Sequence, residues 1–272
     1  MMRRLSHQSL RRALALGILF TALTAARAED RGLKPSYDFV IDINGVVDKG
    51  WKMFSPPTNK TRILLVSPLG DQVMLVSISD KSVRPVDRLM VKTNGDGTTD
   101  ILAGGISATR IIPLVANGAG AAFVADGRTF TLKARPPLLG PHSVEELVTD
   151  RPNFGEGIKS YQPEASAVSF LKSYDKPTEI EVFFGSWCPV CEAWVPKFVK
   201  SLQQAGNSKI QLNLIGVSRD FSTDQNLAKA KGVRGLPTFI IRQNGIEVGR
   251  LVGAPESGTI EAALAGVLKN RS

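Results

Sequence analysis

The 272-residue sequence contains only two cysteines, Cys188 and Cys191, which lie three positions apart. A chain with so few cysteines cannot be a scaffold held together by several disulfides. The two thiols therefore either act together as a chemical site or brace a single turn.

Long apolar runs are also missing, apart from one near the amino terminus. Residues 1–28 contain four arginines before the apolar run Ala13–Ala25 and end with Ala26-Arg27-Ala28. A basic start, an apolar centre and an A-x-A cleavage sequence are typical of a secretory signal peptide. The run is shorter than the roughly 20 residues of a membrane-spanning helix, which disfavours an uncleaved anchor. We therefore predict a signal peptide over residues 1–28, a periplasmic location and no integral membrane span after cleavage.

A strong excess of positive charge is absent once that segment is set aside. The whole chain has a formal net charge of +9, but residues 1–28 contain five arginines and no acidic residue, which leaves +4 for the remainder. No run of basic residues interleaved with aromatic residues remains there, so we predict no nucleic-acid partner. The remaining chain of about 244 residues is long enough for two domains.

Helical periodicity is absent from residues 29–141. Short β-branched runs there alternate with turn sequences such as Asn44-Gly45 and Asn117-Gly118. Regularly spaced short strands of this kind are typical of a small antiparallel sandwich or barrel. We predict an all-β domain over residues 29–141, of a role that the sequence does not indicate. The predicted strands are 37–43, 62–67, 72–78, 88–93, 110–115, 121–125 and 128–134.

One turn of this region contains part of a calcium-binding pattern. Asn94, Asp96 and Asp100 have the spacing of calcium ligands, but the first ligand position is Lys92 and the twelfth, which should be a bidentate acid, is Ala103. The same stretch contains Asn-Gly and Asp-Gly, which are strong signals for a hairpin turn. We therefore predict a turn here and no metal site.

Prolines and glycines interrupt the strand pattern after residue 134. The sequence Ser143-Val144-Glu145-Glu146 is a capping box, which predicts a short helix that ends at Arg151-Pro152. We predict a linker over residues 142–160. His142 is the one histidine outside the signal peptide, and it could act as a base, but a histidine beside a proline in a loop is more often exposed.

Residues 161–272 combine apolar runs with helical periodicity. The runs predict strands over 180–184, 210–217, 237–242 and 247–252, the last two joined by the hairpin turn Asn244-Gly245. The periodicity predicts helices over 165–174, 188–205, 223–231 and 259–268. Strands that alternate with helices in this way are typical of a mixed sheet covered on both faces, so we predict an α/β domain.

The cysteine pair lies where a buried strand turns into the second of these helices. Cys188 is expected at the first helical turn, where unpaired backbone N–H groups and the helix dipole favour negative charge. Such a position lowers the pKa of a thiol from about 8.5 to roughly 3.5–7.5, which makes the sulfur nucleophilic. Cys191 lies one turn later on the same helix face, where it can close a disulfide with Cys188 and resolve a mixed disulfide.

Three motifs follow one another in residues 161–272. The sequence Trp187-Cys188-Pro189-Val190-Cys191 follows the buried strand, Pro196 stands five residues after the second cysteine, and Gly235-Leu236-Pro237-Thr238 comes later. In these motifs and their order the region resembles the thioredoxin superfamily. The resemblance implies a thioredoxin-like fold, a redox-active disulfide Cys188–Cys191, and substrate docking at Leu236 and a cis-proline, Pro237. It also implies that Trp187 forms an apolar wall beside Cys188, and it does not extend to residues 29–141.

Two positions differ from the thioredoxin pattern. Thioredoxin carries a buried acid six residues before its first cysteine, where this chain has Val182, and the neighbouring Glu181 should point to the opposite face of the strand. Glu192 stands where thioredoxin has a lysine, and its charge opposes formation of a thiolate. Both differences predict redox properties unlike those of cytoplasmic thioredoxin.

These observations predict a periplasmic thiol–disulfide oxidoreductase with Cys188 as the nucleophile and Cys191 as the resolving thiol. The absence of a large helical insertion resembles the compact reducing type, although the sequence does not fix the direction of electron flow. The expected partners are proteins with thiols or disulfides and an electron-transfer partner, and thiol exchange needs no cofactor. One alternative is an envelope binding or assembly protein with an inert thioredoxin-like scaffold. Another is chelation of Cu(I) by the two thiolates, for which no His or Met lies nearby in the sequence.

Overall fold

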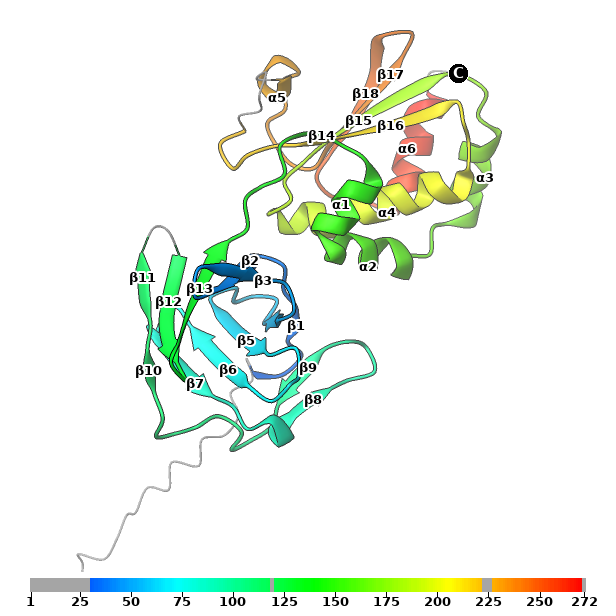
Figure 1. Ribbon diagram of the computed structural model, residues 1–272. Helices are drawn as coiled ribbons and strands as arrows, with labels where there is room; N and C mark the ends of the chain where they lie inside the picture. Colours follow the sequence, from blue (N-terminus) through cyan, green and yellow to red (C-terminus); the bar gives the residue numbers. More distant parts are fainter. Residues whose placement is uncertain (1–29, 118–119, 222–226, 271–272) are drawn as a thin grey trace, which may run out of the picture.

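The computed structural model describes residues 30–117, 120–221 and 227–270. The predicted signal peptide, residues 1–28, lies outside the described residues, as does the first part of the helix predicted over 223–231. The strands β1–β13 form one unit, which we call the β domain, and β14–β18 form a second unit together with the six helices (Figure 1). We call this second unit the α/β unit.

The β domain consists of antiparallel strands, so the predicted all-β fold is confirmed. One sheet contains, in spatial order, β1 (Lys34–Pro35), β4 (Lys52–Ser55), β5 (Arg62–Val66), β6 (Val73–Ser77), β7 (Ser82–Pro85) and β10 (Ile112–Pro113). The other contains β11 (Val115–Asn117), β12 (Gly120–Ala125), β13 (Arg128–Ala134), β2 (Phe39–Ile43) and β3 (Val46–Asp48). The 3-10 helix η2 (Arg88–Met90) precedes a hairpin of β8 (Val91–Thr93) and β9 (Thr99–Ile101), which contains the turn predicted at Asn94–Gly97.

Two apolar clusters hold the β domain together. Between the two sheets, the ring of Phe130 stacks on Phe123 with centroids 4.9 Å apart and meets the edge of Trp51 at 5.4 Å. The second cluster lies under the β8–β9 hairpin. Neighbouring residues of β5 belong to different clusters. Ile63 belongs to the cluster between the two sheets, and Leu64 belongs to the cluster under the β8–β9 hairpin. Both side chains are fully buried. Strand β5 is therefore buried on both faces, which explains its continuous apolar sequence.

The connection between the units contains more regular structure than its sequence indicates. Strand β14 (Gly140–His142) pairs with the α/β sheet, and the capping box at Ser143 starts helix α1 (Val144–Asp150) as predicted. A second helix, α2 (Pro152–Ser160), begins where the sequence predicts the end of helical structure. Proline is favourable at the first position of a helix, so Pro152 starts α2 rather than stopping α1. His142 lies in β14 and is half-buried, so the expectation of an exposed loop histidine is wrong.

The α/β unit contains a five-stranded mixed sheet, which confirms the predicted α/β class. Its spatial order is β14, β16 (Ile210–Gly216), β15 (Thr178–Phe184), β17 (Thr238–Gln243) and β18 (Ile246–Val252). Only the central pair β15–β16 is parallel. The remaining helices are α3 (Ala165–Ser173), α4 (Pro189–Ala205), α5 (Leu227–Ala230) and α6 (Ile260–Lys269).

The helices cover the two faces of this sheet unequally. On one face, Val182 and Phe184 of β15 pack into a large cluster with side chains from α1, α2, α3, α4 and α6. On the other face, Phe183 packs with Ala228 of α5 and Val233 in a small cluster. The predicted cover on both faces is thus present, but within the described residues one short helix provides it on the second face.

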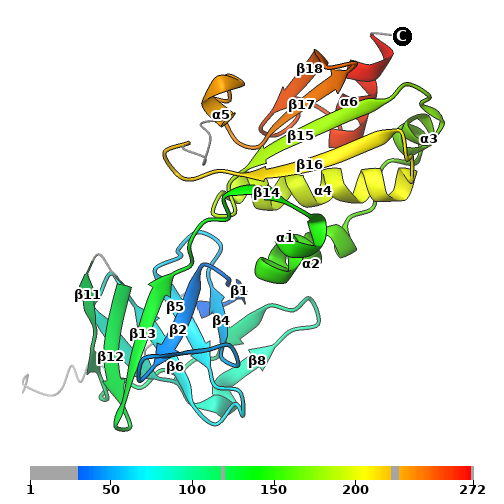
Figure 2. The same cartoon turned by 45° about the horizontal axis from the view of Figure 1, so that its top comes forward.

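Helix α2 supports the helix that carries the cysteines and also faces the β domain (Figure 2). A Cβ atom added to Gly157 of α2 would lie 2.8 Å from Cβ of Pro196 in α4, so only glycine allows this close approach. On the side toward the β domain, the Tyr37 hydroxyl donates a hydrogen bond of 3.0 Å to Glu156 of α2. The position of α4 therefore depends on a helix that contacts both units.

The close contact at Gly157 predicts the effect of an alanine substitution there, and a glycine in another helix serves as the control position. Alanine favours a helix by about 1 kcal/mol over glycine, but overpacking costs about 1–3 kcal/mol. Because the added Cβ would meet the rigid ring of Pro196, we expect Gly157→Ala to lower the free energy of unfolding by about 0.5–2 kcal/mol. Gly266 in α6 has no atom within 4 Å of its added Cβ, so Gly266→Ala should raise stability by about 0.5–1 kcal/mol. Urea unfolding followed by tryptophan fluorescence measures both, and a stabilised Gly157→Ala variant would contradict the packing described here.

Candidate active site

The two cysteines lie at the start of α4, directly after the central strand β15. Gly185 to Trp187, which we call the active-site turn, link the two elements, and Cys188 N donates a hydrogen bond of 3.0 Å to Gly185 O. Cys188 is the N-cap residue, and its Sγ accepts a hydrogen bond of 3.4 Å from Cys191 N. Pro189 occupies the first helical position, where a missing N–H does no harm. The predicted position of Cys188 at the helix start is therefore the observed one.

Cys188 is the more acidic of the two thiols. Its pKa is lowered to about 6, first by a hydrogen bond from the Cys191 side chain and then by the backbone N–H groups of Cys191 and Val190, which together outweigh the effect of burial. The residue is 7% exposed and therefore mostly buried, although less completely than Cys191. A thiol with this pKa is mostly ionised at neutral pH and can attack a disulfide.

Cys191 has the opposite character. It is fully buried, and both its hydrogen bond to Cys188 and its burial raise its pKa far above the ordinary value, although Gly185 N donates to its Sγ at 3.4 Å. Both residues are free thiols in this structure. The pair therefore consists of an acidic thiol at the start of α4 and a more deeply buried, protonated thiol one turn later.

A loop at the same end of the sheet lies against Cys188, because Thr238, which follows this loop, pairs with Phe183 near the end of β15. The Leu236–Pro237 peptide bond is cis, as the resemblance implied, and Leu236 O lies 4.0 Å from Cys188 Sγ. The loop is fixed on both sides, because Gly253 N donates to Pro237 O at 2.7 Å and Thr238 Oγ1 donates to Gly235 O at 2.7 Å. The structure thus brings together three of the predicted site residues, Cys188, Leu236 and Pro237, which lie about 50 positions apart in the sequence.

Trp187 lies beside Cys188 and is held from two sides. A Cβ added to Gly185 would come within 2.8 Å of the indole ring and 3.2 Å of Cys188 Cβ, so the ring and the cysteine meet over this glycine. The indole N–H donates to Val217 O at 3.1 Å, and the guanidinium of Arg219 lies 4.7 Å from the ring centroid. Arg219 was not among the predicted site residues, because nothing in the sequence connects a loop arginine to this ring.

The acidic residues near the site lie where strand alternation places them. Val182 is fully buried on the face toward α4, whereas Glu181 points to the other face and forms ion pairs with Lys231 and Arg242. Glu192 is partly buried, and its own pKa is raised by that burial. Its charge raises the pKa of Cys191, and repulsion between the charges of Cys188 and Glu192 also raises the pKa of Glu192. The charge of Glu192 therefore opposes ionisation of both cysteines, in the predicted direction.

A buried arginine ties the active-site turn to the linker. Arg151, between α1 and α2, is 4% exposed, and its guanidinium donates to Pro136 O at 2.6 Å and to Ser186 Oγ at 3.4 Å. Ser186 Oγ also accepts from Leu138 N at 2.9 Å. The sequence does not reveal this contact, because Arg151 and Ser186 are 35 positions apart and belong to no common motif.

The described residues contain neither a cluster of metal ligands nor a membrane-spanning helix. Within residues 30–117, 120–221 and 227–270, no three His, Cys, Asp or Glu side chains gather closely enough to hold a metal ion. In the same ranges, no helix has the length and apolar character needed to cross a membrane.

Comparison with known proteins finds thioredoxins similar to the part of the chain that contains the cysteine pair. The family model described as Thioredoxin matches residues 166–266, which include both cysteines and the cis-proline. The thioredoxin of Echinococcus granulosus is 35% identical over 79 residues, which make up 29% of this chain and 68% of that protein. The chloroplastic F-type thioredoxin of Spinacia oleracea is 33% identical over 89 residues, 32% of this chain and 43% of that protein. A solved mutant thioredoxin from Halobacterium salinarum NRC-1 is 26% identical with a TM-score of 0.27, and the match covers 40% of this chain and 85% of that one.

The unequal acidity of the two thiols predicts the pH dependence of alkylation. Because iodoacetamide reacts with the thiolate, its rate with the reduced protein should rise through a midpoint near pH 6, the pKa of Cys188. Cys191→Ala removes the largest cause of the lowered pKa, so the midpoint should move to higher pH, whereas Cys191→Ser keeps a donor and should move it less. Cys188→Ala should react slowly over the whole range, since Cys191 is buried and protonated. A midpoint that stays near 6 in Cys191→Ala would contradict the assigned role of the hydrogen bond.

Proposed function

Because this chain belongs to the thioredoxin family, we propose that it is a periplasmic thiol–disulfide oxidoreductase that acts through Cys188 and Cys191. The observation that carries the proposal is the pairing of an acidic Cys188 at the start of α4 with a fully buried, protonated Cys191. The Leu236–Pro237 loop beside Cys188 supports a docking position for the substrate backbone. Extended polypeptides often bind through main-chain hydrogen bonds, which tolerate many sequences.

The proposed reaction follows from the different states of the two sulfurs. The Cys188 thiolate attacks one sulfur of a substrate disulfide, that S–S bond breaks, and the released substrate thiolate takes up a proton. Cys191 then loses its proton and attacks the Cys188 sulfur, which releases the second substrate thiol and leaves a Cys188–Cys191 disulfide. Two electrons have passed to the substrate, and an electron-transfer partner must return two electrons to the pair before the next cycle.

The periplasmic setting and the reducing direction are the finer parts of the proposal. The signal-peptide pattern of residues 1–28 supports export. The sheet, the helices and the cysteine pair of the α/β unit belong to one continuous stretch of the chain. The described part of this stretch contains no inserted helical domain, which supports a compact reductant. The Trp187 ring beside Cys188 restricts which disulfides can approach Cys188. The cis-proline loop, by contrast, can bind substrates of many different sequences.

The reaction order predicts that removal of the resolving thiol traps substrates. In Cys191→Ala the mixed disulfide between Cys188 and a substrate has no internal thiol to release it, so covalent complexes should accumulate in periplasmic extracts and disappear on treatment with dithiothreitol. Mass spectrometry of the complexes identifies the partners. Cys188→Ala is the matched control and should trap nothing. If Cys191→Ala forms no mixed disulfide while Cys188 alkylates at neutral pH, the enzymatic proposal fails and the alternative of an inert scaffold is favoured.

The pKa of Cys188 also predicts the reduction potential. Compared with the pKa of about 7 in thioredoxin, a pKa of about 6 stabilises the thiolate at pH 7 by about 1 kcal/mol more. Since about 1.4 kcal/mol corresponds to 30 mV for a two-electron couple, we expect a potential about 20 mV above the roughly −270 mV of thioredoxin, near −250 mV. Equilibration with glutathione buffers measures it. A value above about −180 mV would contradict the reducing direction, and one below about −300 mV without turnover would indicate a structural disulfide.

A further inference from the structure

The β domain contains a large open cavity on the side of the linker helices. Its volume is about 1240 Å³, and its walls come from β4, the β3–β4 connection, the turn at Pro68–Gly70, η2 and β8. Arg135, Asp150 and Pro152 of the connecting segment complete one side. Small-molecule sites usually have volumes of about 300–1,000 Å³ and enclose their ligand, so this cavity is larger than a typical one.

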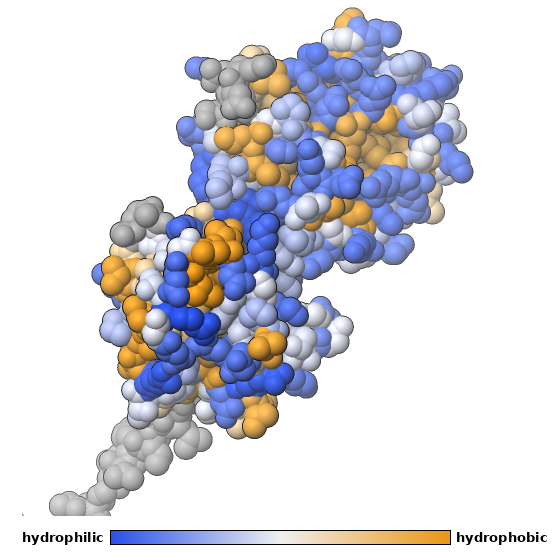
Figure 3. Space-filling model, in the orientation of Figure 1, coloured by the Kyte–Doolittle hydropathy of each residue, from blue (hydrophilic) through white to orange (hydrophobic). Residues whose placement is uncertain are grey.

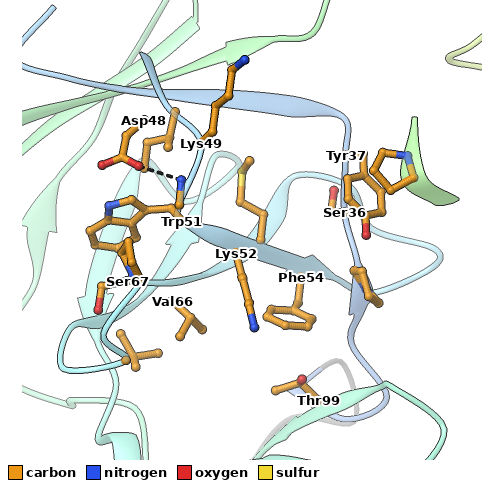
Figure 4. A pocket seen from close by; sticks show the side chains of 18 of the residues that line it. Ser36, Tyr37, Asp48, Lys49, Trp51, Lys52, Phe54, Val66, Ser67 and Thr99 are labelled. Atoms are coloured by element: carbon orange, nitrogen blue, oxygen red, sulfur yellow. Dashed lines mark hydrogen bonds between the residues drawn. The ribbon is translucent and has the colours of Figure 1, made fainter. Parts of the chain in front are cut away.

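The inner surface of the cavity combines apolar side chains with a cation. Figure 4 shows Lys52, Phe54 and Val66 along neighbouring strands, with Trp51 close by. Phe54 and Val66 pack on the cluster under the β8–β9 hairpin, and Trp51 is 7% exposed, so this apolar floor is held in place by the core. Figure 3 likewise shows apolar areas interspersed with hydrophilic side chains on the β domain.

The charges around the cavity are mainly positive and lack intramolecular partners. Lys49, Lys52 and Arg88 line it, and none of the three forms an ion pair with another residue in the described part of the chain. By contrast, Arg135 lies 3.6 Å from Asp150, and Asp48 Oδ1 already accepts from Gly50 N at 2.8 Å. Residues 30–135 contain 14 Lys and Arg against 10 Asp and no Glu, whereas residues 136–272 contain 15 against 14. The positive excess of the chain after residue 28 is therefore concentrated in the β domain.

We propose that this cavity docks an acidic segment, with interspersed apolar side chains, of the proteins whose disulfides are exchanged at Cys188. The unpaired cations complement the acidic side chains, and the floor of Phe54, Val66 and Trp51 complements the apolar ones. An extended segment suits the shape, because β1 and β3 are edge strands that border the cavity and a polypeptide can follow such edges. The identity of the partner as a redox substrate depends on the proposed function, whereas the docking itself does not.

The cavity is connected to the redox site through lining residues that contact, or lie next to residues that contact, the supporting helix α2 and the active-site turn. Tyr37 lines the cavity and donates to Glu156 of α2, the helix that packs on α4. Asp150 and Pro152 line it as well, and Arg151 between them contacts Ser186 of the active-site turn. A polypeptide that leaves the cavity along this side reaches the helices that support Cys188. Binding at two places on one substrate raises the effective concentration of its disulfide at the active site.

Binding of a cysteine-free peptide tests the docking separately from redox chemistry. The probe is a fluorescein-labelled 12-residue peptide in which Glu alternates with Phe and Leu, measured by fluorescence anisotropy with the reduced full-length protein. Lys52→Gln/Arg88→Gln should weaken binding about 3- to 10-fold at low ionic strength, and the difference should shrink in 0.5 M salt. Lys159→Gln/Lys172→Gln removes two exposed charges from the α/β unit and should bind like the unmodified protein. Equal affinity for a peptide with Lys in place of Glu, or no effect of the cavity variant, would overturn the proposal.

A second measurement tests the link to disulfide exchange. The same acidic segment is joined to a short disulfide-containing peptide, and its reduction is compared with that of the disulfide peptide alone. The segment should raise kcat/KM about 10-fold or more in the unmodified protein, and Lys52→Gln/Arg88→Gln should lose most of this gain while it reduces the short peptide normally. Binding without acceleration would overturn the link between cavity and active site. If neither disulfide is reduced, the proposed function fails, and the anisotropy experiment still decides whether the cavity binds acidic peptides.

Discussion

The hydrogen bond between the two sulfurs is the interaction on which the chemistry of this protein depends. It is the largest cause both of the lowered pKa of Cys188 and of the raised pKa of Cys191, the two states that the proposed nucleophile and resolving thiol require. The contact requires Cys191 one turn below an N-cap cysteine, and the core cluster keeps water away from it. Strand β15, the glycine at position 185 and the packing of α2 on α4 all serve to hold this geometry.

The linker connects the two units and also contacts the active-site turn. Arg151 is a buried cation, and removal of a partner from a buried charge generally costs about 3–5 kcal/mol. Its partners are Asp150, Pro136 O and Ser186 Oγ, so the arginine fixes the linker and the active-site turn at the same time. A shift of the linker would therefore move the turn that carries Trp187. Polar contacts, such as Tyr37 with Glu156 and Arg135 with Asp150, link the β domain to the helices that support the redox pair.

The sequence predicts the parts of this structure that short motifs specify. The Cys-Pro-Val-Cys helix start, the cis-proline loop and the capping box at Ser143 each depend on neighbouring residues and are found as expected. Strands β3, β4, β7 and β9 escape prediction because each has only three or four residues. Helix α2 escapes because a proline at a helix start and one at a helix end look alike without the tertiary contact. The roles of Arg151 and Arg219 depend on partners distant in sequence, which no local pattern contains.

In the proposed function, the charge distribution gives the two units different tasks in recognition. Main-chain contacts at a cis-proline loop accept many sequences, and the nearly balanced charge of the α/β unit adds little long-range preference. A reductant that acts on any exposed disulfide would also reduce structural ones, so it needs discrimination from elsewhere. The β domain carries the excess positive charge and the open cavity, and electrostatic complementarity mainly affects association rates and the choice of partner. In this proposal, selection by the β domain and chemistry at Cys188 occupy separate units, which are linked by polar contacts such as Tyr37 with Glu156 of α2 and Arg135 with Asp150.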